Sequence, residues 1–235
     1  VLGFPPGHPT ALAQMGALVE TPSLYDHLSG RENVEITRLL RNAAPSETER
    51  VLSQVGLGSD AHRLVKTYSL GMKQRLGLAL ALIDQPRLLI LDEPANGLDP
   101  AGIQEMRELI RRIPVELGAT VFLSSHLLSE VEQVASQVVV IHRGHLRYQG
   151  PMDQMGGFSK ARLSLRVSDP SSALRLLESK GYAAALSAEH LVVETSPLDA
   201  PRIAEALVNQ RIDLFELIPL RESLEARFLS LIEEP

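Results

Sequence analysis

The chain has 235 residues, of which 44% are hydrophobic, a formal net charge of −6 and no cysteine. This composition supports a folded protein with a sizeable apolar core, and it excludes a disulfide framework or a thiolate metal site. The acidic balance disfavours a general nucleic-acid binder, so we expect no nucleic-acid partner.

The first part of the chain combines one short apolar strand with several helices. Residues 15–19, MGALV, predict a strand, and helical periodicity extends from Ser29 to Ile83. Within this stretch, SETERVLSQVG begins at Ser46, which we predict to be a helix N-cap, with Glu49 completing a capping box.

The next elements alternate between strands and helices. RLLIL (87–91) is a continuous apolar run typical of a buried parallel strand. IQEMRELIRRI (103–113) is an amphipathic helix that we expect Pro114 to end. ATVFLSS (119–125) is a second buried strand, and the helical LLSEVEQVA follows it. This order predicts an α/β core with a parallel sheet.

A predicted hairpin and a linker separate the α/β core from a second domain. VVVIHRGHLRYQG (138–150) predicts a hairpin that turns at Arg143 and Gly144. MDQMGG (152–157) has the composition of a linker, and we expect a second domain to begin after it.

The second domain, residues 158–235, predicts a small α+β fold. ARLSLRVS (161–168) alternates apolar and polar residues, as a half-buried strand does. A helix, two strands, a helix and an apolar strand (212–218) follow, and this βαββαβ order is typical of a ferredoxin-like fold. A last amphipathic helix is predicted, with an apolar face made of Leu224, Phe228, Leu231 and Ile232.

Two adjacent acids, Asp92 and Glu93, follow the strand at 87–91. A parallel strand delivers its last residues to the ligand-binding edge of an α/β sheet. An aspartate there can hold Mg²⁺ beside a phosphate, and a neighbouring glutamate can act as general base toward water. The pattern alone is equally compatible with solvated acids at the end of a strand.

Three further motifs decide between these interpretations. TYSLGMKQRLGLALAL (67–82) precedes the acids, DEPANGLDP contains them, and SSH (124–126) follows one helix and one strand later. In this order and spacing they resemble the signature sequence, the Walker B motif with its D-loop, and the switch histidine of ATP-binding cassette (ABC) ATPases. The resemblance covers about residues 1–157. It implies a P-loop NTPase-like domain with a helical subdomain at about 23–84.

This resemblance implies ATP and Mg²⁺ as cofactors. Asp92 is the expected metal ligand, and Glu93 and His126 are the expected catalytic residues, the imidazole contacting a γ-phosphate oxygen. Ser69 and Gly71 begin a helix whose free N–H groups and dipole favour an anion.

Further site residues are expected at a subunit interface. By resemblance, the anion at Ser69 and Gly71 is the γ-phosphate of ATP held by the opposite subunit, so the site requires a homodimer or a paired ABC subunit. Ser69 also suits a simple N-cap. Asp99 resembles the D-loop aspartate, and it equally suits a turn before Pro100. Glu20 stands at the position of the Q-loop glutamine and is expected to ligate Mg²⁺.

The phosphate-binding loop of these ATPases does not occur in the sequence. It requires G-x-x-x-x-G-K-[ST], and none of the 16 glycines is followed by lysine. We expect that the chain lacks an N-terminal segment that carries this loop. A natural pseudo-ATPase is the alternative.

The resemblance implies an ATP-hydrolysing transporter subunit, most similar to exporters of drugs, antibiotics or peptides of the bacitracin and lantibiotic type. Such a subunit drives a separate transmembrane permease from the cytoplasmic face of the cell membrane. The ending SLEARFLSL resembles the same branch. The alternatives are a soluble ABC ATPase that acts on ribosomes or DNA, and a non-catalytic interaction module.

Overall fold

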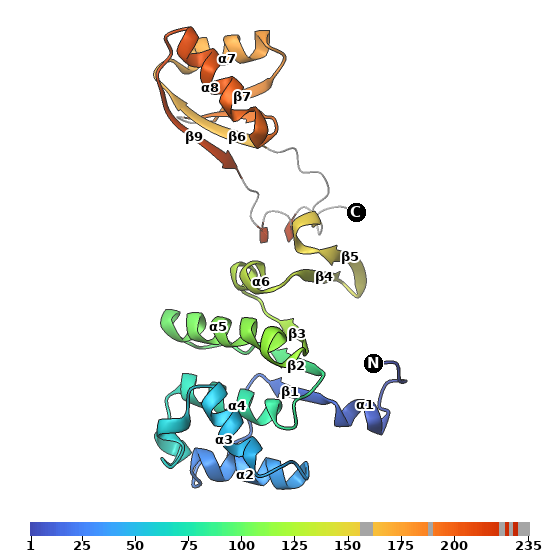
Figure 1. Ribbon diagram of the computed structural model, residues 1–235. Helices are drawn as coiled ribbons and strands as arrows, with labels where there is room; N and C mark the ends of the chain where they lie inside the picture. Colours follow the sequence, from blue (N-terminus) through green and yellow to red (C-terminus); the bar gives the residue numbers. More distant parts are fainter. Residues whose placement is uncertain (156–161, 188–189, 221–223, 226–227, 230–235) are drawn as a thin grey trace. The chain divides into compact units, whose positions relative to one another are not determined.

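The computed structural model describes residues 1–155, 162–187, 190–220, 224–225 and 228–229. The chain forms two compact units, Val1–Val134 and Ala135–Pro235, coloured from blue to green and from yellow to red in Figure 1. Each unit has its own hydrophobic core. The domain boundary after residue 157 stays a prediction. Leu231, Ile232 and most of SLEARFLSL lie outside the described residues.

A three-stranded parallel sheet lies at the centre of the first unit, as the sequence predicts. Its strands are β1 (Met15–Val19), β2 (Leu88–Asp92) and β3 (Thr120–Ser124), in this order across the sheet. Val19 lies opposite Asp92, and Asp92 lies opposite Ser124. All three carboxyl ends therefore meet at one edge of the sheet.

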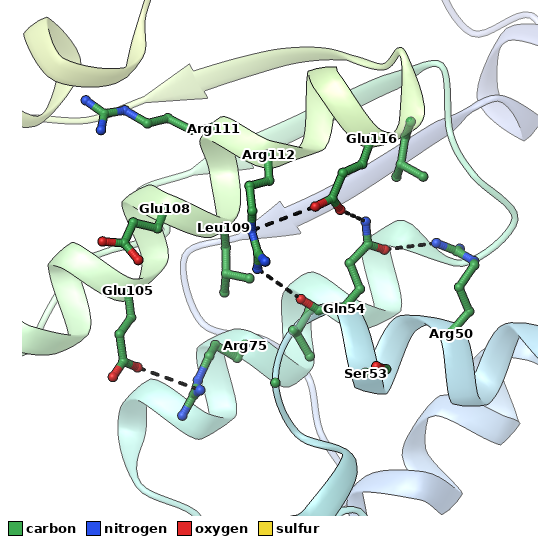
Figure 2. A pocket seen from close by; sticks show the side chains of 13 residues that line it. Arg50, Ser53, Gln54, Arg75, Glu105, Glu108, Leu109, Arg111, Arg112 and Glu116 are labelled. Carbon is green, nitrogen blue, oxygen red and sulfur yellow. Dashed lines mark hydrogen bonds and ion pairs between the residues drawn. The ribbon is translucent and has the colours of Figure 1, made fainter.

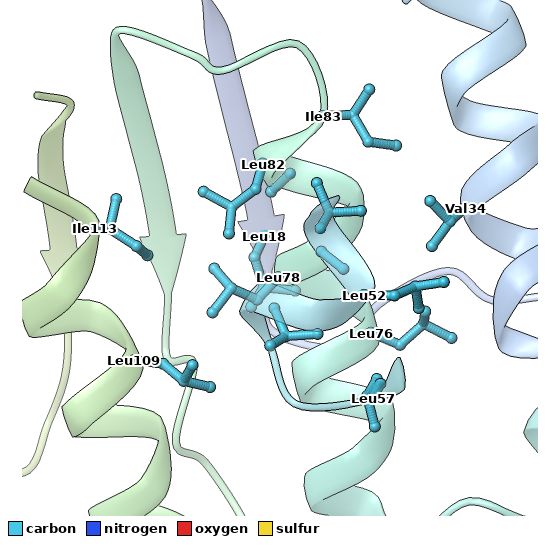
Figure 3. Packing of buried hydrophobic residues seen from close by; sticks show 14 of the residues in the cluster. Leu18, Val34, Leu52, Leu57, Leu76, Leu78, Leu82, Ile83, Leu109 and Ile113 are labelled. Atoms are coloured by element: carbon cyan, nitrogen blue, oxygen red, sulfur yellow. The ribbon is translucent and has the colours of Figure 1, made fainter. Parts of the chain in front are cut away.

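Helices pack on one face of this sheet and on one another. They are α2 (Gly30–Leu40), α3 (Ser46–Gln54), α4 (Leu70–Leu82) and α5 (Pro100–Leu117). Figure 3 shows leucines of α4 between the sheet and α2 and α3. Two glycines allow the close approach of α4 to β1: a Cβ atom on Gly16 would lie 1.9 Å from the Ala81 carbonyl oxygen, and one on Gly77 would lie 2.8 Å from Leu18 Cδ1.

The predicted capping box at Ser46 is wrong. Pro45 is the N-cap of α3, and no side chain caps that helix. Pro45 already has helical dihedral angles (φ −56°, ψ −29°), so Ser46 lies inside the first turn, where its hydroxyl is misplaced for capping. The capping box is instead at α2: the Ser29 hydroxyl accepts from Glu32 N (3.2 Å), and the Glu32 carboxylate accepts from Ser29 N (2.7 Å).

The prediction that Pro114 ends its helix is also wrong, because α5 continues to Leu117. The missing N–H of Pro114 removes one helical hydrogen bond, but Met106, Ile110 and Ile113 bury the inner face of α5 and hold the helix in place. The helix ends at Gly118, which has a left-handed φ of 64° that glycine adopts without a steric penalty.

Two short helices, α1 (Pro9–Ala13) and α6 (Leu128–Val134), complete the first unit. The predicted hairpin is confirmed by β4 (Gln137–His142) and β5 (His145–Pro151), which pair antiparallel. Its turn residues, Arg143 and Gly144, both have positive φ (50° and 79°), which matches the right-handed twist of the two strands.

The second unit contains a four-stranded antiparallel sheet. Its strands are β6 (Arg162–Val167), β7 (Ala183–Ser187), β8 (His190–Glu194) and β9 (Leu214–Leu220), in the order β7-β8-β6-β9. The helices α7 (Pro170–Ser179) and α8 (Ala200–Asn209) contribute to the core on one face of the sheet. This topology confirms the predicted βαββαβ order.

Candidate functional site

A hydroxyl group links the ends of β2 and β3. Ser124 Oγ donates a hydrogen bond to Asp92 Oδ1 (2.5 Å) and accepts one from Glu93 N (3.3 Å). Glu93 N also lies 3.2 Å from the Ser124 carbonyl oxygen. Glu93 has a φ of 49°, a left-handed conformation that is uncommon outside glycine and often occurs at functional sites.

The predicted catalytic residues contact each other. His126 Nδ1 lies 2.8 Å from Glu93 Oε2. While the Glu93 carboxylate is ionised, it can only accept, so Nδ1 carries the proton and Nε2 faces outward. The His126 side chain is 61% exposed, whereas that of Glu93 is 25% exposed. An accessible imidazole therefore holds a partly shielded carboxylate in one orientation.

Glu20, predicted as a metal ligand, follows β1 at the same edge of the sheet. Its φ is 21°, its carbonyl oxygen accepts from Gln74 Nε2 (2.9 Å), and its carboxylate accepts from Asn96 Nδ2 (3.3 Å). Asn96 N in turn donates to the Glu93 carbonyl oxygen (3.0 Å). The structure thus joins Glu20 to the loop that begins with Asp92 and Glu93.

Gln74 and Asn96 are site residues that the sequence analysis missed. Gln74 is 3% exposed, and its Oε1 is buried with no hydrogen-bond partner among the residues that the structure describes. Gln74 lies between Lys73 and Arg75 in the sequence, so the local pattern does not distinguish this buried amide from its charged neighbours. Nothing in the sequence alone links Asn96 to Glu20.

The remaining predicted residues lie at the starts of helices. Ser69 is the N-cap of α4, and its hydroxyl accepts from Met72 N (3.2 Å). Asp99 is the N-cap of α5 and accepts from Gly102 N (3.0 Å). Ser69 therefore has the capping role that the sequence left open, and Asp99 caps α5, where the sequence left open a turn before Pro100. Within the described part of the chain, no hydrogen bond joins Ser69 or Gly71 to the acids at the sheet edge.

Two clefts of the first unit differ in their relation to this site. A cavity of about 360 Å³ is lined by Glu20, Gln74 and Asn96, among others. A larger cleft of about 950 Å³ lies between α3, α4 and α5 and contains none of the predicted site residues. Figure 2 shows this larger cleft, where the Gln54 amide donates to Glu116 (3.0 Å). The chemistry of the sheet edge, not the size of a cleft, identifies the candidate site.

The residues at the sheet edge fit a magnesium ion that is shared with a phosphate. Carboxylate and hydroxyl oxygens from Asp92, Glu20 and Ser124 are the hard ligands that Mg²⁺ prefers, and Mg²⁺ is commonly held by only one or two carboxylates plus substrate phosphates. Among the described residues, no group of three or more acidic, histidine or cysteine ligands could hold an ion by itself. The same part of the chain contains no helix that is long and apolar enough to cross a membrane.

Comparisons with known proteins identify the family. A family profile described as "ABC transporter" matches residues 6–96. The chain is 38% identical over 225 residues to the bacitracin transport ATP-binding protein BcrA of Bacillus licheniformis, which covers 94% of this chain and 74% of the relative. It is 47% identical over 135 residues to the lantibiotic transport ATP-binding protein SrtF of Streptococcus pyogenes, covering 57% and 58% of the two chains.

A solved structure supports the fold. The structure of an ATP-binding subunit of an ABC transporter matches with a TM-score of 0.56 and 27% identity, over 66% of this chain and 67% of that one. The family resemblance and the ABC ATPase fold that the sequence predicts are therefore confirmed. The chain belongs to the ATP-binding subunits of the ABC transporter family, whose enzymatic activity is ATP hydrolysis.

Proposed function

We propose that this chain is the ATP-hydrolysing subunit of an exporter of antibiotics, drugs or peptides. The observation that carries the proposal is the cluster at the ends of β2 and β3, in which Ser124 contacts Asp92 and His126 contacts Glu93. The named relatives that transport bacitracin and lantibiotics support the substrate class.

Each residue at the sheet edge has a role in this proposal. Asp92 and Glu20 would hold Mg²⁺, which neutralises phosphate charge when bound. Glu93 accepts a proton from the attacking water as general base. His126 keeps the Glu93 carboxylate oriented and, when doubly protonated, donates from Nε2 toward a phosphate oxygen. Ser124 fixes the side chain of Asp92 and the backbone of Glu93 together.

Ser69, Gly71 and Asp99 act across a dimer interface in this proposal. The start of α4 presents backbone N–H groups and a helix dipole to an anion, and Ser69 and Leu70 are exposed there. We assign that anion to the γ-phosphate of ATP bound by a second subunit. A homodimer or a paired ABC subunit therefore completes the site.

The proposed partner is a transmembrane permease, and the proposed location is the cytoplasmic face of the cell membrane. An acidic chain (net charge −6) does not favour a nucleic-acid partner. This also counts against the second candidate, an ABC ATPase that acts on ribosomes or DNA.

Affinity purification from membranes separates the candidates. The tagged protein should co-purify a permease with several membrane spans in detergent, whereas ribosomal proteins in its place would favour the second candidate. Co-expression of the permease with a subunit that contains these residues and also carries a phosphate-binding loop should raise resistance to bacitracin-type peptides, and the Glu93→Gln variant should abolish that gain. Unchanged resistance with the active pair would remove the proposed substrate class while leaving the ATPase assignment intact.

A further inference from the structure

The two edges of the second unit's sheet differ in how they are protected. The β9 edge has Pro219 within the strand, a register shift opposite Arg166 and Val167, and an ion pair between Arg166 and Glu216 (2.7 Å). Proline, irregular register and charge are devices by which sheet edges avoid pairing with other strands. This edge is therefore unsuited to accept another strand.

The β7 edge has none of these devices. Its sequence is AAALS (Ala183–Ser187), without charge or proline, and its register with β8 is regular throughout. In the described part of the chain, β7 pairs only with β8, and four of its five residues are exposed. An exposed, regular and uncharged edge presents unpaired N–H and C=O groups that are ready to bind a further strand.

One apolar side chain on β7 lacks a neighbour on its outer side. Leu186 lies opposite Leu191, which is fully buried on the helix-covered face of the sheet. Leu186 lies on the same face but is 55% exposed, because the sheet ends there. A strand added beyond β7 would cover it.

We propose that β7 is a dimerisation edge, at which β7 of a second copy of this chain binds antiparallel. The two four-stranded sheets then form one sheet of eight strands. A two-fold axis at Ala185 places Ala185 opposite its own equivalent, and Ala184 opposite Leu186 of the second copy. This pairing lets each Leu186 contact a small side chain across the junction.

A second copy fits this edge because the strand is compatible with itself. A two-fold interface brings the same surface from both chains together, so any charge on it would face a like charge. The chain carries a net charge of −6, yet β7 carries none. The small alanine side chains also permit close approach of the two strands.

This inference goes beyond the proposed function and does not depend on it. The β7 edge lies in the second unit, and nucleotide, metal and the sheet edge around Glu93 take no part in the pairing. A failure of the β7 dimer leaves the ATPase proposal untouched, and the reverse also holds.

Site-specific disulfide formation tests the pairing directly, because the chain has no native cysteine. In the proposed register, Cα atoms at residue 185 lie about 4.5–5.5 Å apart, within the range of a disulfide bond. Cα atoms at residue 187 are offset by four residues, about 13 Å along the strands, and exceed the limit of about 7 Å. Ser187→Cys is therefore a matched control on the same strand.

We expect Ala185→Cys to form an interchain disulfide at least about tenfold faster than Ser187→Cys, without nucleotide, under mild oxidation. A mixture of Ala183→Cys and Ser187→Cys chains should also cross-link, although Ser187→Cys alone should not. Circular dichroism should show that the cysteine variants unfold at the same temperature as the parent, since the replaced side chains are small and exposed.

Two outcomes would overturn the proposal. One is equal cross-linking of Ala185→Cys and Ser187→Cys, which shows that the register does not exist. The other is a monomer in sedimentation equilibrium of the unmodified full chain at tens of micromolar, which leaves this edge for a strand of another protein.

Discussion

The parallel sheet of the first unit and the four-stranded antiparallel sheet of the second unit place chemical groups in opposite ways. In the first unit, parallel strands end together, and their register brings Asp92 beside Ser124, with Glu20 and Glu93 one residue beyond. In the second unit, neighbouring strands run antiparallel. The carboxyl ends of two neighbouring strands therefore point in opposite directions. The carboxyl ends of neighbouring strands meet only where the strands are parallel, which explains where the candidate site lies.

Backbone strain follows the same division. Glu20 and Glu93 have left-handed φ values directly after strands, where no helix end requires them. In the described residues of the second unit, left-handed φ occurs at Gly181 and Arg211, each just after a helix, and at the Arg143-Gly144 hairpin turn. This conformation is routine at both kinds of position. Left-handed residues that follow a strand outside a hairpin turn therefore mark the site better than those at helix ends.

The largest expected effect is on ATP turnover, and it should differ between a glutamate of the parallel sheet and one of the antiparallel sheet. In a subunit that also carries a phosphate-binding loop, Glu93→Gln should lower the ATP turnover rate by about 10²–10⁴-fold, because the general base is lost. Glu216→Gln removes an acid from the antiparallel sheet and is the matched control, with turnover close to the parent. Steady-state ATPase assays measure both. Near-parental turnover of Glu93→Gln would contradict its proposed role.

A nucleotide titration shows whether the sheet edge suffices by itself. In the proposed function, residues 1–235 supply metal, base and γ-phosphate contacts, but the sequence has no glycine-rich loop with its lysine. That loop anchors the phosphates, so we expect calorimetry with Mg·ATP to detect no binding in the micromolar range and no turnover. Micromolar binding with hydrolysis would mean that another segment anchors the phosphates.

Core substitutions test whether the two units unfold independently. Leu89 and Leu163 are fully buried, one in each core. Truncation to alanine should cost about 2–5 kcal/mol of unfolding free energy at either site. Scanning calorimetry should show that Leu89→Ala lowers only the transition of the first unit, and Leu163→Ala only that of the second. A single transition shifted by both variants would show that the cores unfold together.

Acid should affect the stability of the first unit through Glu47. Its carboxylate accepts from Arg50 (2.5 and 2.7 Å) and from Asp84 N (3.0 Å). The hydrogen bond from Arg50 is the main cause that lowers the pKa of Glu47 in the folded state.

This stabilisation is present above the unfolded-state pKa and is lost as the pH falls through the lowered folded-state pKa. The unfolding temperature of the first unit should therefore drop as the pH falls below the ordinary glutamate pKa of 4.5, and less steeply in Glu47→Gln. Identical pH profiles of the parent and this variant would exclude Glu47 as the source.

The smallest expected effect concerns two serines at helix starts. Ser29→Ala removes a capping box that the structure shows, and should cost about 1 kcal/mol of unfolding free energy. Ser46→Ala removes no cap and should stay within about 0.5 kcal/mol of the parent. Urea unfolding measures both. A larger loss for Ser46→Ala would mean that Ser46 caps α3 in solution.

Much of this protein follows from its sequence. The apolar run at 87–91 with its two acids, the strand at 15–19 and the Arg143-Gly144 turn are all decided by local periodicity and turn chemistry, and the structure confirms them. These features depend on neighbours in the chain, so a single sequence contains the information. The order and spacing of the motifs likewise indicate the family, because each motif is a short run of adjacent residues.

Other features depended on contacts between distant residues. The continuation of α5 past Pro114 depended on burial against the core, whereas the absence of a cap at Ser46 depended on the local backbone angles of Pro45. The contacts of Glu20 with Gln74 and Asn96 join residues 54 and 76 positions apart. Tertiary structure decides such contacts because a hydrogen bond needs both groups at contact distance, and local sequence patterns describe only one group at a time.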